Sequence, residues 1–431
     1  MTTPPISGPV FAPGADACAD RVGRGERLAY LVAFAVLLCA RLPDVLLYAR
    51  FWAEEGAVFF ERAWTMPWYD ALLAPFGGYL NIVANGGALL ARYLVPLEMA
   101  PYVTTTIGLL FQLTPAIVLL TARDSWLQRR VVLVFALAII AMPLASEELW
   151  LQTLHSQFYL TLCAALILAL DPATGVVRFL RRALLLLAGL SGLVPAALVP
   201  LFVLRAILDR SYGRAIDAGV LGFAVAAQLL VFYSVDPSRS YAISPDLFLA
   251  IAFVRHIALS ILGVEISEQI ATYVRAQVSQ GHTPLWAPAI SIAVFSLLAL
   301  ALFIRRCPAL ICLFASGCAV FAVSCFGALS DLPGLIHILV HQRYFFVSQV
   351  VFGLVVLGIA ATGRDLISKV AWVFVVWFVA ISSLGYFSTW DFIAHGPDWR
   401  SEVAAWRKDP SRPLKIWPTD WVMKLPPEAA R

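Results

Sequence analysis

Residues 28–47, LAYLVAFAVLLCARLPDVLL, form the first long apolar segment, and residues 51–56, FWAEEG, follow it closely. About 20 apolar residues are enough to cross a bilayer as a helix. We therefore expect this segment to deliver two adjacent carboxylates, Glu54 and Glu55, to a membrane surface among aromatic side chains. Because desolvating a carboxylate is costly, an acidic pair at this depth is a candidate functional site.

The composition indicates the fold class. The chain has 431 residues, of which 61% are hydrophobic and 13% charged, and its mean hydropathy is +0.83. That is more apolar surface than a soluble protein of this size can bury. The apolar runs are continuous rather than alternating, which disfavours a β-barrel. We predict an all-α polytopic membrane protein. The net charge of +4 does not indicate a nucleic-acid partner, because the basic residues lie in short loops between apolar runs.

Basic residues concentrate in loops on the cytoplasmic side of a membrane, which orients the chain. By this rule, we expect the apolar stretches 79–98 and 248–264 to stay on the outer face as interfacial or re-entrant helices and not to cross the membrane. The same rule predicts about 11 transmembrane helices: 28–47, 102–121, 131–146, 156–171, two short helices within 184–204, 216–234, 286–304, 309–329, 343–361 and 370–388.

The chain then divides into five parts. Residues 1–27 are a disordered cytoplasmic N-terminus, and 28–234 are a catalytic transmembrane module with a first outer loop at 48–101. Residues 235–285 are an outer loop with an in-plane or re-entrant helix, 286–388 are C-terminal transmembrane helices, and 389–431 are a Trp-rich outer tail. The Ala-, Arg- and Leu-heavy usage favours a bacterial inner membrane, with the tail in the periplasm.

Polar side chains from distant segments converge on the same predicted outer face. A carboxylate there can take a proton from a hydroxyl group, and an arginine can hold a phosphate through paired hydrogen bonds. Simpler interpretations exist: two adjacent glutamates can mark a turn, and a nearby histidine can be an ordinary interfacial residue. The candidates for substrate binding are Tyr79, Glu147, Glu148, His155, Gln157, Arg255, His256, His341, Arg343 and Tyr344.

The chain shows no Walker A sequence, no dinucleotide-binding glycine pattern and no H-E-x-x-H. Nucleotide sugars are not readily available to an enzyme that works on the outer face of the membrane. An activated sugar donor on that face would therefore come attached to a lipid.

Four stretches of the chain form a recognisable combination: the acidic pair in 51–56, the loop 75–80 (PFGGYL), the acidic loop 147–148 before 155–158 (HSQF), and the hairpin-like 187–195 (LAGLSGLVP). Together they resemble the GT-C superfamily of integral-membrane glycosyltransferases, which use polyprenyl-phosphate-linked sugars. The resemblance covers roughly residues 28–215. Many family members carry Asp-Glu after the first span, the first acid being the base. Glu54 occupies that position, yet it is Glu rather than Asp, so the choice between Glu54 and Glu55 stays open.

The resemblance implies a GT-C-like bundle with periplasmic juxtamembrane helices, and an inverting transferase with a carboxylate base. Its donor would be a polyprenyl-phosphate sugar and its acceptor a glycan, lipid or protein, at the surface of the lipid bilayer. No cofactor is identified, although Glu147 or Glu148 could bind a divalent cation. The alternatives are a transporter or flippase of lipid-linked sugars, and a surface-polysaccharide polymerase or ligase. Transporters usually show corresponding broken helices in two halves, and here only one half has an evident break.

Overall fold

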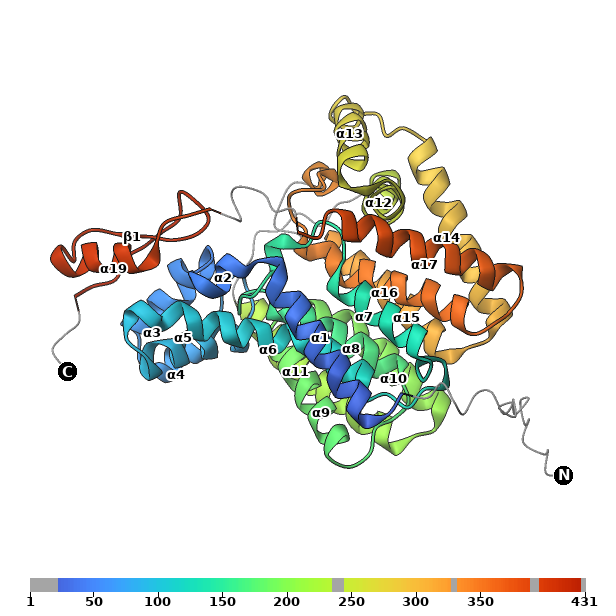
Figure 1. Ribbon diagram of the computed structural model, residues 1–431, viewed down its shortest axis with the longest axis horizontal. Helices are drawn as coiled ribbons and strands as arrows, with labels where there is room; N and C mark the ends of the chain where they lie inside the picture. Colours follow the sequence, from blue (N-terminus) through green and yellow to red (C-terminus); the bar gives the residue numbers. More distant parts are fainter. Residues whose placement is uncertain (1–21, 235–243, 327–331, 388–394, 428–431) are drawn as a thin grey trace.

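The computed structural model describes residues 22–234, 244–326, 332–387 and 395–427, and this part of the chain is almost entirely helical (Figure 1). The helices of eight or more residues are α1 (Arg24–Arg41), α5 (Ile82–Leu94), α6 (Ala100–Leu120), α7 (Arg130–Ala141), α8 (Ser156–Ala169), α9 (Gly175–Leu190), α10 (Val199–Asp209), α11 (Tyr212–Ser234), α12 (Pro245–Ala252), α13 (Leu259–Ser279), α14 (Trp286–Arg305), α15 (Pro308–Phe326), α16 (Arg343–Ala361), α17 (Leu366–Leu384) and α19 (Trp399–Lys408).

The remaining elements are short. They are α2 (Pro43–Leu47), α3 (Glu61–Thr65), α4 (Trp68–Leu73), the π-helical η2 (Glu55–Phe60) and η7 (Phe253–Ala258), and the 3₁₀ turns η3 (Leu97–Met99), η4 (Ser125–Leu127), η5 (Glu147–Leu149), η6 (Val194–Leu198) and η8 (Pro333–Ile336). Two short strands, β1 (Leu414–Lys415) and β2 (Val422–Met423), pair antiparallel near the C-terminus.

Seven helical segments in the described residues are long and apolar enough to cross a membrane. The bent pair Gly175–Leu190 and Val194–Asp209 makes an eighth if it counts as one span. The structure therefore supports a helical, multi-pass membrane protein, whereas the predicted count of 11 crossings is not confirmed. The seven are Leu97–Leu120, Tyr212–Ser234, Pro245–Ser279, Trp286–Arg305, Pro308–Phe326, Arg343–Ala361 and Leu366–Leu384.

Several predicted spans are shorter or start elsewhere in the structure. Helix α7 has 12 residues and α8 has 14. At 1.5 Å per residue they reach roughly 18 and 21 Å, less than the roughly 30 Å of a bilayer core. Helix α1 begins at Arg24, inside the predicted disordered terminus, and ends at Arg41. It ends there because the next helix starts with Pro43, and a residue before proline avoids helical geometry.

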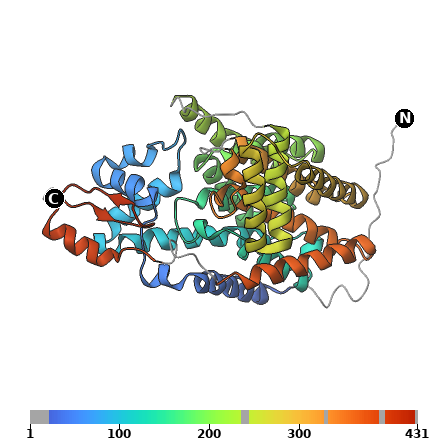
Figure 2. The ribbon, with the colours of Figure 1, turned by 90° about the horizontal axis from the view of Figure 1, so that it is seen from above.

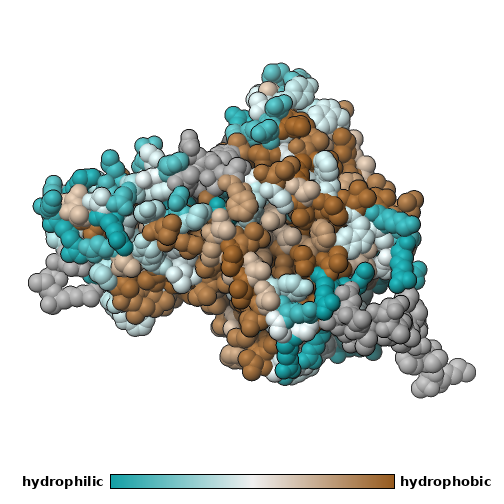
Figure 3. All heavy atoms as spheres, in the orientation of Figure 1, coloured by the Kyte–Doolittle hydropathy of each residue, from teal (hydrophilic) through white to brown (hydrophobic). Residues whose placement is uncertain are grey.

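The bundle has buried central helices and apolar outer ones. All 14 residues of α8 are buried, and 78% of the apolar stretch of α16 is buried, compared with 22% for α14 and for α17. The exposed faces of the outer helices are hydrophobic, and Figure 3 shows this apolar surface over the bundle. Apolar faces of this extent suit contact with lipid.

The predicted helix break within 184–204 is present. The chain bends by 120° between helix α9 and the segment Val194–Asp209. A Cβ atom at Gly189 would lie 2.5 Å from Ala224 Cβ, so the glycine allows α9 to pack closely on α11. The first arm of the pair starts at Gly175, well before the predicted start at residue 184, and it includes basic residues.

The segment that carries Arg255 is longer than the predicted helix at 248–264. It runs through α12, η7 and α13, with one break at Gly263, whose φ of 76° and ψ of −177° are not helical. By length and composition, Pro245–Ser279 can cross a membrane. Its in-plane or re-entrant placement therefore stays a prediction.

A second lobe sits beside the bundle. It contains α2 to α5 from the first predicted outer loop and, packed on them, residues 395–427, which we call the tail (Figures 1 and 2). On the face that Figure 3 shows, this lobe carries more hydrophilic surface than the bundle does. Two segments from opposite ends of the chain thus form one lobe.

Candidate functional site

A cavity of about 520 Å³ lies among the first predicted outer loop, the helix break, α8, α11, α15 and α16, and we call it the polar cavity. Its apolar lining includes Leu193 and Val194 at the helix break and Phe232 on α11. The cavity thus offers an acid, an arginine and an apolar surface to a single bound molecule. The predicted site residues that line it are Glu54, Tyr79, His155, Gln157, Arg343 and Tyr344.

Glu54 reaches the cavity from a tight turn. Ala53 has a φ of 43°, in the left-handed region that non-glycine residues seldom occupy. Its carbonyl oxygen accepts hydrogen bonds from the amides of Gly56 and Ala57, so a helix starts directly after the turn. Glu54 is therefore at a helix N-terminus, where free N–H groups favour a negative charge.

Glu55 has a different environment. Its side chain is buried and does not line the polar cavity. One carboxylate oxygen accepts hydrogen bonds from the amide of Thr153, at 2.8 Å, and from its hydroxyl, and the other accepts from the amide of Trp52 at 3.4 Å. Burial raises the pKa of Glu55, and these hydrogen bonds oppose the shift. The structure thus distinguishes the pair: Glu54 faces the cavity, and Glu55 ties the turn to Thr153.

Arg50 completes the buried surroundings of Glu55. Its guanidinium carbon lies 4.7 Å from the ring centre of Trp52 and 4.2 Å from that of Trp417 in the tail. Burial lowers the pKa of Arg50 to about 9, although the charge of Glu55 acts in the opposite direction. Arg50 is therefore still cationic at neutral pH and contacts an aromatic ring from each of the two segments of the lobe.

Arg343 is the first residue of α16 and forms an ion pair with Glu148. A cation at a helix N-terminus is unfavourable for the helix, so helix stability does not explain this arginine. Burial acts to raise the pKa of Glu148, but the charges of Arg343 and His155 and hydrogen bonds from Arg343 outweigh it, so the pKa is lowered. Glu148 is therefore ionised at neutral pH and orients Arg343, whose guanidinium has five N–H donors in all.

His155 stands at the start of α8, and its Nδ1 lies 3.0 Å from the carbonyl oxygen of Glu148. A carbonyl only accepts, so the tautomer assigned from this contact carries its proton on Nδ1. Burial lowers the pKa of His155 to about 4, against the charge of Glu148. The ring is therefore neutral near pH 7, and its Nε2 can accept a hydrogen bond from a hydroxyl group.

Gln157 and Tyr79 form a further polar part of the cavity. The side-chain amide of Gln157 donates to the hydroxyl of Tyr79 at 3.4 Å and to the carbonyl of Leu154 at 3.5 Å. A Cβ atom at Gly192 would lie 2.3 Å from Oε1 of Gln157. The glycine at the helix break therefore leaves room for this amide, which links the predicted break directly to the site.

Sequence reasoning missed Gln228, which holds the loop next to Tyr79. Its buried amide accepts from the backbone N–H of Leu80 and donates to the carbonyl of Leu80, both at 2.8 Å. A glutamine within the apolar run 216–234 is the signal that could have pointed to it. The pair of bonds fixes the first predicted outer loop to α11.

Several predicted substrate-binding residues lie outside the polar cavity. Glu147 pairs with Arg41 at 2.9 Å, and the ring of His341 lies 6.0 Å from that of Tyr344. Arg255 is fully buried, and its guanidinium donates to backbone carbonyls in η8 and in the loop between η8 and α16. It therefore ties η7 to that loop, and it does not line the polar cavity. These carbonyls belong to Leu335, His337, Ile338 and Val340.

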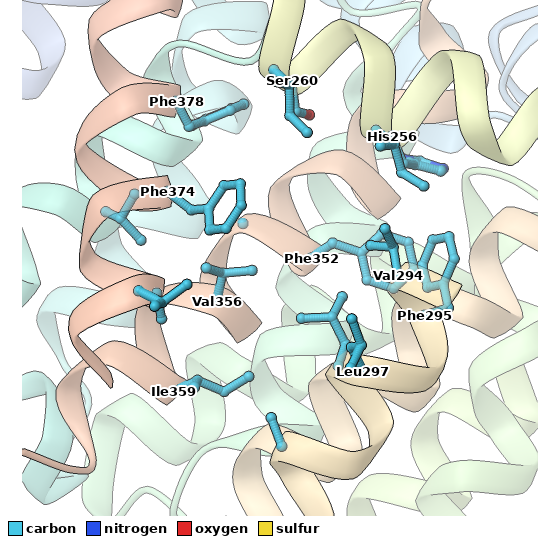
Figure 4. A pocket seen from close by; sticks show the side chains of 18 of the residues that line it. His256, Ser260, Val294, Phe295, Leu297, Phe352, Val356, Ile359, Phe374 and Phe378 are labelled. Atoms are coloured by element: carbon cyan, nitrogen blue, oxygen red, sulfur yellow. The ribbon is translucent and has the colours of Figure 1, made fainter. Parts of the chain in front are cut away.

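His256 lines a second cavity, of about 340 Å³, among η7, α13, α14, α16 and α17 (Figure 4). The walls of this cavity are almost entirely apolar. The ring of His256 packs edge-on against aromatic rings there, with centroids 4.8 Å from Phe321 and 5.2 Å from Phe352. His256 therefore lies in a different cavity from Arg343, although both are predicted substrate-binding residues.

The described part of the Trp-rich tail does not line the polar cavity. Within residues 22–234, 244–326, 332–387 and 395–427, no three His, Cys, Asp or Glu side chains come together as a metal site would require. Glu147 and Glu148, the residues considered for a divalent cation, each pair with an arginine.

In comparisons with known proteins, no family model, no curated protein and no solved structure matches this chain. The resemblance to the GT-C superfamily therefore rests on the sequence features alone.

Proposed function

We propose that this chain is a membrane glycosyltransferase of the GT-C type that moves a sugar from a polyprenyl phosphate to a glycan, lipid or protein acceptor. One observation carries the proposal: Glu54 and Arg343 line the same cavity as an apolar surface from candidate membrane-spanning helices. An amphipathic donor needs the arginine and the apolar surface, and the acceptor hydroxyl needs the carboxylate as its base. The donor's sugar-phosphate would meet polar groups while its polyprenyl chain stays against apolar side chains.

In the proposed reaction, Arg343 binds the donor phosphate while Glu148 orients its guanidinium. Glu54 takes the proton of an acceptor hydroxyl, and the acceptor oxygen forms a bond to the anomeric carbon. The bond between that carbon and the phosphate oxygen breaks on the opposite side, so the configuration inverts. The electron pair leaves with polyprenyl phosphate, whose charge Arg343 stabilises.

The other polar residues of the cavity would position the sugars. The Nε2 atom of neutral His155 accepts from a hydroxyl group, and Gln157 and Tyr79 can both donate and accept. This division assigns proton transfer to Glu54 alone. Glu55, buried and hydrogen-bonded to Thr153, would support the turn instead of reacting.

We place the chain in a bacterial inner membrane, with its N-terminus in the cytoplasm and the polar cavity and tail in the periplasm. Arginine-rich loops between the apolar segments support this orientation. A phosphatase reporter that is active only in the periplasm, fused after residue 431, tests it. Activity of the fusion supports the assignment, and an inactive but well-expressed fusion contradicts it.

The enzymatic proposal is tested with purified protein in liposomes, polyprenyl-phosphate hexoses and pentoses as donors, and envelope glycan and lipid extracts as acceptors. A deletion strain analysed by mass spectrometry identifies the acceptor, because its unmodified form accumulates. The wild type should transfer sugar, Glu54→Gln should lose about 100-fold or more in turnover, as expected for a general base, and Arg343→Ala should bind donor poorly. Full transfer by Glu54→Gln would refute the mechanism. Translocation of the donor without transfer would support a flippase instead.

A further inference from the structure

The tail is bound to the turn that carries Glu54 through backbone hydrogen bonds. The amide of Trp417 donates to the carbonyl of Phe51 at 3.1 Å, and the amide of Ala53 donates to the carbonyl of Trp417. Together these bonds form a parallel bridge between Trp52 and Trp417. The residue directly before Glu54 is therefore fixed by the other end of the chain.

Ala53 needs this support because of its backbone conformation. Its φ of 43° is unfavourable for a residue with a Cβ atom, and such conformations persist only where the surroundings enforce them. Without the bond from its amide to the tail, Ala53 would relax toward a negative φ. That rotation would redirect the chain at Glu54, the next residue.

Other contacts hold Trp417 in this position. Its indole N–H donates to the carbonyl of Pro397 at 3.0 Å, and its ring lies against Arg50. A Cβ atom at Gly396 would come within 2.3 Å of the ring, so the backbone of the tail packs directly against Trp417.

The packing extends to the residues on either side of the acidic pair. A Cβ atom at Gly56 would lie 2.8 Å from Cδ1 of Ile416, and the ring of Phe51 meets that of Trp399 edge-on at 5.2 Å. The tail thus contacts the turn closely both before and after Glu54 and Glu55.

From these contacts we infer that the tail is a positioning element for the carboxylate of Glu54, with Trp417 as the positioning residue that holds Ala53 in its strained conformation. The inference rests on the proposed function, in which Glu54 is the base. A misplacement of about 1 Å in a reacting group can cost about 100-fold in rate, so the tail would control turnover without touching the substrate.

The first part of the test measures the turn without any substrate. Hydrogen exchange of residues 51–57 is compared in the wild type, in Trp417→Ala and in Gly396→Ala, which displaces the ring while keeping it. Trp421→Ala is the matched control, because it changes a partly exposed tryptophan of the same tail. Both test variants should exchange about tenfold faster or more in 51–57, and the control should not. Unchanged exchange in both test variants overturns the inference, whatever the protein catalyses.

The second part measures transfer from polyprenyl-phosphate hexoses and pentoses. Trp417→Ala should lower kcat about 10- to 100-fold with KM for the donor within about twofold, whereas Trp417→Phe should retain most of the activity because its ring can still pack on Arg50. Adding Ala53→Gly to Trp417→Ala should restore part of kcat, since glycine adopts a positive φ without help.

The results separate this inference from the proposed function. Faster exchange with an unchanged kcat means that Trp417 supports the turn but does not position the base, and it overturns the inference. A wild type that transfers no sugar refutes the function, while the exchange result still shows whether the tail holds the turn. A fall in kcat that Ala53→Gly does not relieve overturns the role of Ala53.

Discussion

Replacing Glu55 by alanine should destabilise the fold much more than replacing the adjacent Glu54 by alanine. Glu54 lines the polar cavity at a helix N-terminus, so Glu54→Ala removes a cavity-facing charge and should change the free energy of unfolding by less than about 1 kcal/mol. Glu55→Ala removes the acceptor for the amide and hydroxyl of Thr153 and for the amide of Trp52. It also leaves buried Arg50 without the negative charge of Glu55. Breaking a buried pair from one side costs about 3 to 5 kcal/mol.

The assay is thermal unfolding of the purified variants in detergent, followed by tryptophan fluorescence at a fixed heating rate because membrane proteins often unfold irreversibly. Glu55→Gln is the intermediate case, since an amide oxygen still accepts from Thr153 while the charge is lost. The expected order of stability is wild type, Glu54→Ala, Glu55→Gln and Glu55→Ala, from highest to lowest. Equal unfolding temperatures for Glu54→Ala and Glu55→Ala would refute the assignment of Glu55 to the turn.

Three further predictions concern the polar cavity. Burial lowers the pKa of His155 from 6.5 to about 4, so His155 takes up a proton at a higher pH in the unfolded chain than in the folded one. The contribution of the neutral, buried ring to the free energy of unfolding is therefore fully present above pH 6.5 and is lost as the pH falls toward 4. Between pH 7 and pH 4 the free energy of unfolding of the wild type should fall by at most about 3 kcal/mol through this group, and His155→Gln should not show that fall. An equal fall in His155→Gln excludes His155 as the cause. Gly192→Ala should push Gln157 into the cavity, which should lower the free energy of unfolding by about 1 to 3 kcal/mol and weaken donor binding. Gly219→Ala is the control, because an added Cβ atom there meets no neighbouring atom. Arg343→Ala should raise KM for a polyprenyl-phosphate sugar about 10- to 100-fold with partial recovery in Arg343→Lys, and an unchanged KM in both would remove the phosphate role.

The parts of the fold that follow from local sequence could be predicted. Long apolar runs identify most helices, and the Gly/Pro sequence in 187–195 gives the break that the structure shows. Glu54, His155 and Arg343, which the charge pattern assigns to one membrane face, line one cavity, whereas the membrane face itself stays a prediction. The helices and the break depend on hydropathy and on backbone chemistry within short windows of sequence.

The remaining features depend on contacts between distant segments. Sequence cannot tell which of two adjacent glutamates turns toward Thr153, because that depends on the positive φ at Ala53. It cannot show that the guanidinium of Arg255 donates its hydrogen bonds to backbone carbonyls 80 residues or more away in the chain. Nor does a run of tryptophans near the C-terminus reveal that one of them pairs with residues 51–53.

The central claim is that Glu54 and Arg343 act on one lipid-linked sugar in the polar cavity. Photocrosslinking with a polyprenyl-phosphate hexose that carries a diazirine near the phosphate tests it directly, with the labelled residues identified by mass spectrometry. We expect labels on the cavity lining, such as Leu193 and Phe232, retained in Glu54→Gln and lost in Arg343→Ala. Labels confined to the apolar cavity around Phe352, or labelling that does not depend on Arg343, would contradict the account.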